Sequence, residues 1–272
     1  TGISCGVDSL STIYDHFIRE RDTNFRINAL FYFNCGIFGE FGDPQWLELT
    51  LNRNEPGKRA AKDLGLPCYY LNSNLHAFRK LVDMNKLNFI AVYSCALSLG
   101  NAVSRYYISS GTNYQEIKQF NDHYHNKDMS GFSESYLVPL IQTERTELIV
   151  DGCQYRRVDK LKNIVDWDIA RKYLNVCLLQ KGADSTNCGK CSKCLRTMLA
   201  LEILGKLDDF AQVFPVEEYR KESLMYKAHV LENADTETFY RELVDLAAEK
   251  NFTMPTKKTC YVLNGQVVVM EE

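Results

Sequence analysis

The sequence has no apolar run long enough to cross a membrane. Its most apolar stretch covers residues 87–100 and includes the polar residues Asn88, Ser94 and Ser98, whereas a membrane-spanning helix needs about 20 mostly apolar residues. We therefore expect no membrane partner. The stretch predicts a buried helix instead.

Neither sign of charge is in clear excess. The chain has 32 Lys and Arg against 35 Asp and Glu, a formal charge of −3, with 45% hydrophobic and 25% charged residues. A protein that binds duplex nucleic acid needs a concentrated basic surface, so duplex nucleic acid is not an expected partner. A small molecule or a tRNA remains open as the substrate, and the composition is that of an ordinary globular protein.

A secretory signal is also missing. The chain opens Thr1-Gly2-Ile3 without methionine, so we expect the natural N-terminus to lie upstream. Of the ten cysteines, six are scattered and four crowd between Cys177 and Cys194. Clustered thiols without a secretory signal are typical of a metal site in the cytosol. The sequence therefore predicts a cytoplasmic, metal-binding protein.

Apolar periodicity predicts helices and strands that alternate through the first half of the chain. Helices are expected over 9–22, 44–64 with an interruption at Pro56-Gly57, 89–104 and 143–153; strands over 26–34, 68–71, 105–110 and 137–141; and a long loop over 112–135. This alternation predicts an α/β fold with a doubly wound parallel sheet.

The second half of the chain reads as mainly helical. One helix follows the cysteines, with Leu195, Met198, Leu199 and Ile203 on one side, and charged helices are expected over 217–231 and 235–250. The chain closes on a hairpin over 260–269, in which Asn264-Gly265 supplies the tight turn.

The segment Ser4–Ser9 joins small and hydroxyl-bearing residues to the start of the first helix. Free N–H groups and the positive end of the helix dipole suit this segment to phosphate oxygens. Asp8 would repel a bare phosphate, so it either faces a divalent cation or caps the helix. An ordinary helix cap by Asp8 or Ser9 stays open. Neither G-x-G-x-x-G nor G-x-x-x-x-G-K-[ST] is present.

Four cysteines follow the spacing Cys177-x₁₀-Cys188-Gly-Lys-Cys191-Ser-Lys-Cys194. A Cys-x-x-Cys knuckle turns two thiolates toward one ion, and two more complete a tetrahedron. Structural zinc is the favoured interpretation. An iron–sulfur cluster or a redox dithiol stays open as the alternative.

Ser4-Cys5-Gly6-Val7-Asp8-Ser9 resembles the pyrophosphate loop, Ser-Gly-Gly-x-Asp-Ser, of the ATP pyrophosphatases related to adenine nucleotide alpha hydrolases, with Cys5 in place of a glycine. In that family the loop joins the first strand to the first helix, which implies a strand upstream of Thr1. The resemblance implies that ATP is bound by Ser4, Cys5, Gly6, Val7, Asp8 and Ser9, with Mg²⁺ near Asp8. Strand ends beside the switch point add Asn34, Ser110 and Gly111 as nucleotide contacts.

Within this superfamily, residues 1–204 are most similar to 7-cyano-7-deazaguanine synthase, which also carries a C-terminal four-cysteine zinc site. Pro139-Leu140-Ile141 followed by Arg145 and Glu147 resembles a family element, with Arg145 replacing a lysine. The resemblance implies catalytic roles for Asp8 and Arg145. We therefore expect three parts: a nucleotide-binding domain over 1–155, a zinc-binding helical segment over 156–204, and a helical extension with a hairpin over 205–272, which lies outside the resemblance and follows from the change in composition after Gly205.

The resemblance implies an ATP-dependent synthase that uses ATP, Mg²⁺ and Zn²⁺. It would adenylate a carboxylate, release pyrophosphate and go on to an amide or nitrile. The acceptor would be a small-molecule carboxylate, a 7-deazaguanine among the candidates, or a protein. Two alternatives remain: a tRNA-modifying or sulfur-transfer enzyme, and a nucleotide-binding subunit of a bacterial defence assembly that has lost turnover.

Overall fold

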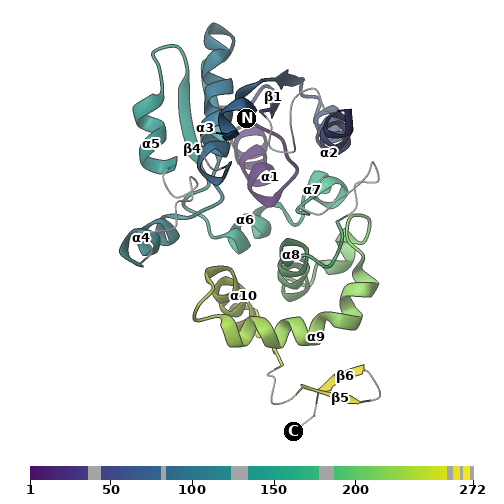
Figure 1. The fold of residues 1–272 in the computed structure, drawn as a ribbon. Helices are drawn as coiled ribbons and strands as arrows, with labels where there is room; N and C mark the ends of the chain where they lie inside the picture. Colours follow the sequence, from purple (N-terminus) through teal and green to yellow (C-terminus); the bar gives the residue numbers. More distant parts are fainter. Residues whose placement is uncertain are drawn as a thin grey trace. The chain divides into compact units, whose positions relative to one another are not determined.

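The structure is a computed structural model that describes residues 1–35, 44–80, 84–123, 134–177, 187–255, 260–263 and 266–269. The chain divides into two compact units, one containing Thr1–Arg156 and the other containing the described residues from Arg157 onward. The first unit mixes α-helices with parallel strands, and the second is mainly helical (Figure 1). None of the helices in the described ranges is long and apolar enough to cross a membrane.

The first unit alternates helices and strands through most of its length. Its elements are α1 (Val7–Ile13), which continues as the π-helix η1 (Tyr14–Arg19), β1 (Leu30–Asn34), α2 (Pro44–Leu64), β2 (Cys68–Asn72), the 3₁₀ helix η2 (Leu75–Lys80), α3 (Met84–Ser98), the 3₁₀ helix η3 (Gly100–Ala102), β3 (Arg105–Ser109), α4 (Tyr114–His123), α5 (Glu134–Ile141) and β4 (Glu147–Asp151).

The strands of this unit form two parallel pairs. β1 pairs with β2, so that Asn34 lies opposite Asn72, and β3 pairs with β4, so that Ser109 lies opposite Asp151. The first three residues touch both pairs: Ile3 N–H donates to Phe31 O at 3.0 Å, and Thr1 Oγ donates to Tyr107 O at 2.8 Å.

One apolar cluster connects the two strand pairs. The ring of Tyr106 on β3 lies 6.1 Å from that of Phe31 and 5.5 Å from that of Phe33 on β1. Buried residues of α3 and α5, Tyr93 and Val138 among them, close the same cluster. Burying large aromatic surface of this kind is the main favourable term in the stability of such a unit.

Residues 137–153 fold in the opposite order from the one that periodicity predicts. The helix α5 covers the expected strand 137–141, and β4 lies within the expected helix 143–153. The apolar run at 137–141 is short enough to fit either state. Its helical form buries Val138 and leaves Leu140 80% exposed, while β4 completes a parallel ladder with β3.

Two further predictions are wrong in detail. The expected loop over 112–135 contains α4, because Asn113 Oδ1 accepts the N–H groups of Gln115 and Glu116 at 2.9 Å and the Glu116 carboxylate accepts Asn113 N–H at 2.7 Å. This reciprocal arrangement is a capping box. The expected break at Pro56-Gly57 is absent as well, since α2 continues through both residues with Gly57 packed on Ile3.

The second unit contains α6 (Arg157–Ile164), α7 (Asp168–Tyr173), α8 (Ser192–Ile203), the 3₁₀ helix η5 (Leu207–Phe210), α9 (Val216–Asn233), α10 (Thr238–Glu249), β5 (Cys260–Leu263) and β6 (Gln266–Val269). The predicted helices over 217–231 and 235–250 are therefore confirmed within a few residues. β5 and β6 pair antiparallel as expected, and the turn residues Asn264 and Gly265 lie outside the described residues.

Candidate functional site

The segment Ser4–Ser9 forms a tight turn into α1. Its N-cap is Gly6, and no side chain caps the helix, so neither Asp8 nor Ser9 acts as the ordinary cap considered above. Ser4 Oγ donates to Ser9 Oγ at 3.1 Å, Gly6 N–H donates to Ser4 Oγ at 3.3 Å, and Ser9 Oγ lies 3.2 Å from Gly6 O. The two hydroxyls thus hold the turn closed beside the uncapped first turn of the helix.

Cys5 has the left-handed backbone conformation that glycine adopts most easily, and glycine stands at this position in the loop that the sequence resembles. Its φ is 57°, in the left-handed region where a side chain costs roughly 1–2 kcal/mol. The thiol is fully buried. Burial, with a smaller contribution from Cys68, raises the pKa of Cys5 to about 12, so this thiol stays protonated at neutral pH and contributes packing and not a thiolate.

Strand register brings the loop to one edge of the unit together with Asn34, Ser110 and Gly111. Gly2 pairs with Phe31 and Thr1 binds Tyr107 O, so Ser4 is level with the ends of β1 and β3. Asn34 Nδ2 donates to Asn72 Oδ1 at 2.7 Å, and Ser110 N–H donates to Asp151 O at 2.9 Å. Open space borders Gly111, because a Cβ there would meet no atom within 4 Å.

The structure does not bring Arg145 to this edge. Arg145 lies in the turn before β4, where its N–H donates to Thr143 Oγ1, and Glu147 begins the strand beside Arg105. Six residues of extended chain, about 20 Å, separate Arg145 from Asp151. Periodicity predicted a helix at Arg145, and the resemblance implied a catalytic role for this residue. It precedes a strand instead, which puts it near the opposite edge.

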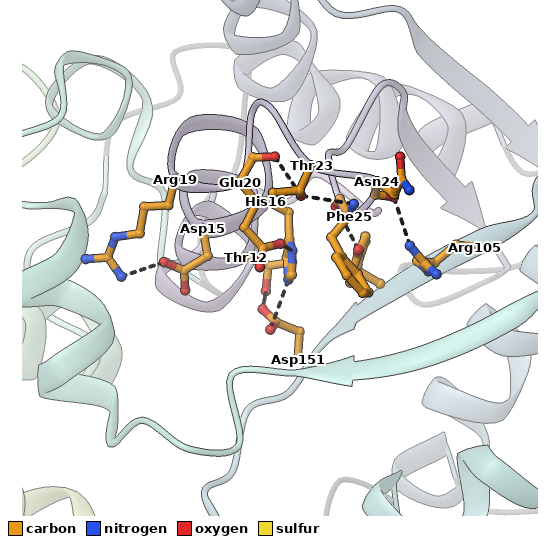
Figure 2. A network of polar contacts seen from close by, with 11 residues as sticks. Thr12, Asp15, His16, Arg19, Glu20, Thr23, Asn24, Phe25, Arg105 and Asp151 are labelled. Atoms are coloured by element: carbon orange, nitrogen blue, oxygen red, sulfur yellow. Dashed lines mark hydrogen bonds and ion pairs between the residues drawn. The ribbon is translucent and has the colours of Figure 1, made fainter.

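A polar network behind the loop was missed by sequence reasoning (Figure 2). Asp151 at the end of β4 accepts Thr12 Oγ1 at 2.7 Å and lies 3.1 Å from His16 Nε2. His16 Nδ1 lies 2.5 Å from Glu20 Oε2, and the imidazole stacks on Tyr107 with 3.9 Å between ring centroids. The spacing Asp8, Thr12, His16 puts these residues on one helix face and is the signal that could have revealed the network.

His16 carries a proton more readily than an isolated histidine. Burial by itself lowers the pKa of His16, but the carboxylates of Asp151 and Glu20 outweigh burial, so the pKa lies above its ordinary value of 6.5. The imidazolium therefore pairs with Asp151 at the end of β4 and with Glu20 at the end of its own helix η1.

A cavity of about 850 Å³ lies at the other end of the strands. Its lining includes Asn28 and Ala29 before β1 and Ser104 and Arg105 at the start of β3. Because these are the amino ends of parallel strands, the cavity is not part of the loop edge.

The four clustered cysteines converge in the second unit. Their Sγ atoms all lie within 4.8 Å of one another, with Cys191 Sγ 3.4 Å and Cys188 Sγ 3.8 Å from Cys194 Sγ. A tetrahedral zinc ion with Zn–S bonds of about 2.3 Å needs S···S separations of about 3.8 Å. The set of donors therefore fits one metal ion such as zinc, as the spacing predicted.

The local fold prepares these thiols to act as ligands. Cys191 is the N-cap of α8, Cys194 lies in its first turn, and Cys191 N–H donates to Cys188 Sγ at 3.4 Å. Burial alone would raise the pKa of Cys188, but N–H groups of Lys190 and Cys191 and the neighbouring thiols lower it to about 7. Cys194 is fully buried, and burial raises the pKa of its thiol.

Comparison of the chain with protein-family models, with curated proteins and with solved structures gave no match in any of the three. The two sites are therefore interpreted from their own geometry and chemistry.

Proposed function

We propose that this protein is an ATP-dependent enzyme that adenylates a carboxylate substrate. The observation that carries the proposal is the Ser4–Ser9 loop, which opens α1 without a side-chain cap at the edge where β1, β3 and β4 end. Backbone N–H groups and hydroxyls at such a turn favour phosphate oxygens. The motif resemblance of these same residues supports the same ligand.

The proposal includes a single doubly wound sheet in the first unit. Residues 1–3 hydrogen-bond to β1 and to Tyr107 on β3, which supports the strand order β2, β1, residues 1–3, β3, β4. This order has its switch point between β1 and β3, where ligands of open α/β sheets bind. Asn34 and Ser110 flank that point.

The chemistry assigns each group a positioning or electrostatic role. The substrate carboxylate attacks the α-phosphorus of ATP, pyrophosphate leaves, and a nitrogen nucleophile then displaces AMP from the acyl-adenylate. Ser4, Gly6, Val7 and Ser9 would hold the β- and γ-phosphates, and the Asp8 carboxylate would hold Mg²⁺, which neutralises phosphate charge when bound. Catalysis of this kind depends on position and charge, and no covalent intermediate with the protein is required.

The four cysteines would hold a structural zinc ion, since a site with four protein thiolates has no open position for substrate. Free thiols and a zinc centre both suit the reducing cytoplasm, which is the compartment we propose. The acceptor is a small-molecule carboxylate of the 7-deazaguanine class. The buried, protonated Cys5 thiol is not a candidate persulfide carrier, because such a carrier needs a reactive thiolate.

ATP–pyrophosphate exchange tests the proposal. With Mg²⁺, labelled pyrophosphate and 7-carboxy-7-deazaguanine, we expect label to enter ATP, and with added ammonium we expect AMP by mass spectrometry. Asp8→Asn should lower exchange at least 100-fold, whereas Ser94→Ala should leave exchange unaltered, because the half-buried Ser94 hydroxyl only donates to Ile90 O within α3. ATP binding without exchange for any of a panel of carboxylates would overturn the enzyme proposal and favour a nucleotide-binding subunit.

A further inference from the structure

Asn187 connects the four-cysteine site to its surroundings through every polar atom of its side chain. Its Oδ1 accepts the N–H groups of Val176 at 2.8 Å and Cys177 at 3.1 Å, and its Nδ2 donates to Leu174 O and Val213 O, both at 2.9 Å. The residue is only 2% exposed. An amide offers two donors and two acceptor positions, so all of the hydrogen-bonding capacity of Asn187 is used inside the protein.

These bonds converge on the one ligand that the knuckle does not hold. Cys188, Cys191 and Cys194 follow one another closely and are oriented by the start of α8. Cys177 is separated from Cys188 by ten residues of chain, so the spacing by itself leaves its position undetermined. The Asn187 amide fixes the backbone at Cys177, and Asn187 N–H donates to Val213 O at 3.1 Å, which anchors the same residue next to the knuckle.

We propose that Asn187 is the positioning residue of the metal centre: its side-chain amide presents Cys177 as the fourth thiolate. The inference rests on the metal site of the proposed function and is independent of the ATP chemistry. Partners that orient metal ligands in this way commonly change metal affinity 10- to 100-fold when they are removed.

The experiment compares metal binding by the full chain and its variants. Zinc affinity is measured by competition with a chromophoric chelator, and ligand identity is measured from the visible spectrum of the Co²⁺-substituted protein. Asn187→Ala should weaken zinc binding 10- to 100-fold and shift the cobalt spectrum toward that of Cys177→Ser. Asn233→Ala is the matched control, because the amide of Asn233 bonds within its own helix to His229 O, and it should behave as wild type.

A double variant separates positioning from general destabilisation. If Asn187 acts through Cys177, Asn187→Ala combined with Cys177→Ser should bind zinc within about twofold of Cys177→Ser alone, because the interaction is already lost. Should Asn187→Ala fail to fold, Asn187→Asp keeps the acceptor for Val176 and Cys177 while lacking the two donors. That variant should keep the four-thiolate cobalt spectrum with weakened zinc binding.

Each result decides between the two proposals. A wild-type protein that binds no zinc overturns the metal site and the role of Asn187 together, and leaves the exchange assay to decide the enzyme proposal. A wild-type four-thiolate spectrum that persists in Asn187→Ala with zinc affinity within twofold overturns the role of Asn187 alone. The role of Asn187 is also overturned if the zinc affinity of the double variant falls by the product of the losses in the two single variants.

Discussion

The two candidate sites are built from different parts of the chain. The candidate metal centre in the second unit consists of four side-chain donors whose positions fit one ion. The Ser4–Ser9 loop in the first unit offers mainly backbone N–H groups, with two hydroxyls that bond to each other. The residue type of a side-chain ligand indicates what it binds, whereas almost every residue offers the same backbone N–H group. The metal centre is therefore the better defined of the two, and the loop depends more on context.

The largest expected effect tests whether the metal holds the second unit together. Cys194→Ser removes a fully buried ligand, and structural zinc contributes on the order of 10 kcal/mol to small domains. We expect metal content to fall from one ion per chain to none and the second unit to lose its cooperative thermal transition. Circular dichroism and metal analysis measure both.

Cys68→Ser is the control for that experiment, because Cys68 lies on β2 in the first unit, does not belong to the four-cysteine cluster, and is only partly buried. It should retain the metal. If Cys194→Ser unfolded like wild type, the cluster would not be a structural metal site, and the contrast between the two units would lose its basis.

Replacing each of two glycines by alanine tests how tightly the cysteine knuckle is packed. Gly189 has φ +71°, and a Cβ there would lie 2.4 Å from Pro215 Cγ; Gly205 has φ +69° with no atom within 4 Å of its Cβ position. Gly189→Ala combines left-handed strain with overpacking, about 2–5 kcal/mol. Gly205→Ala carries the strain alone, about 1–2 kcal/mol. Chemical denaturation measures both, and equal losses would contradict the close approach of Pro215.

A pH experiment addresses the first unit, in which the titratable side chain of His16 contacts Asp151 at the end of β4. The pKa of His16 is raised in the folded state, so its stabilisation is complete below pH 6.5 and is lost as pH rises through the folded pKa. His16→Gln should therefore cost about 1–3 kcal/mol at pH 6 and much less at pH 9.

The measurement is the difference in unfolding free energy between wild type and His16→Gln across that range; the second unit is identical in the two proteins, so its own pH dependence cancels in the difference. The groups facing the imidazole are Asp151, Glu20 and Tyr107. A difference that is independent of pH would mean that His16 packs as a neutral ring on Tyr107.

Sequence patterns predicted those parts of this fold well in which the structure is determined by residues close together in the chain. Cysteine spacing predicted the convergence of four thiols, since knuckle geometry is local. Strands β1 and β3 were predicted within a few residues because apolar runs ending in turn residues mark buried parallel strands. β2 was predicted within one residue as well, although none of its residues is buried. The spacing of Asn113 and Glu116 is that of a capping box and could have predicted the start of α4, but it lies among other polar residues and was overlooked.

Other parts depend on contacts that no local pattern contains. Residues 137–141 fit a helix or a strand by periodicity, and pairing of β3 with residues 147–151 decides between them. The network of His16 and Asp151 joins residues 135 positions apart, and the role of Asn187 depends on Val213 O, a partner 26 residues away. Sequence alone could name the residue types but not these pairings.

The smallest expected effect tests whether Arg145 belongs to the loop site. Arg145 precedes β4 and lies about 20 Å of extended chain from the strand end that faces α1. Arg145→Ala should therefore leave ATP–pyrophosphate exchange within twofold of wild type and change stability by less than about 0.5 kcal/mol, as is usual for exposed residues. Asp8→Asn in the same assay provides the expected large loss. A tenfold loss of exchange in Arg145→Ala would mean that the turn before β4 reaches the phosphates, and the loop edge would then have to be redrawn to include it.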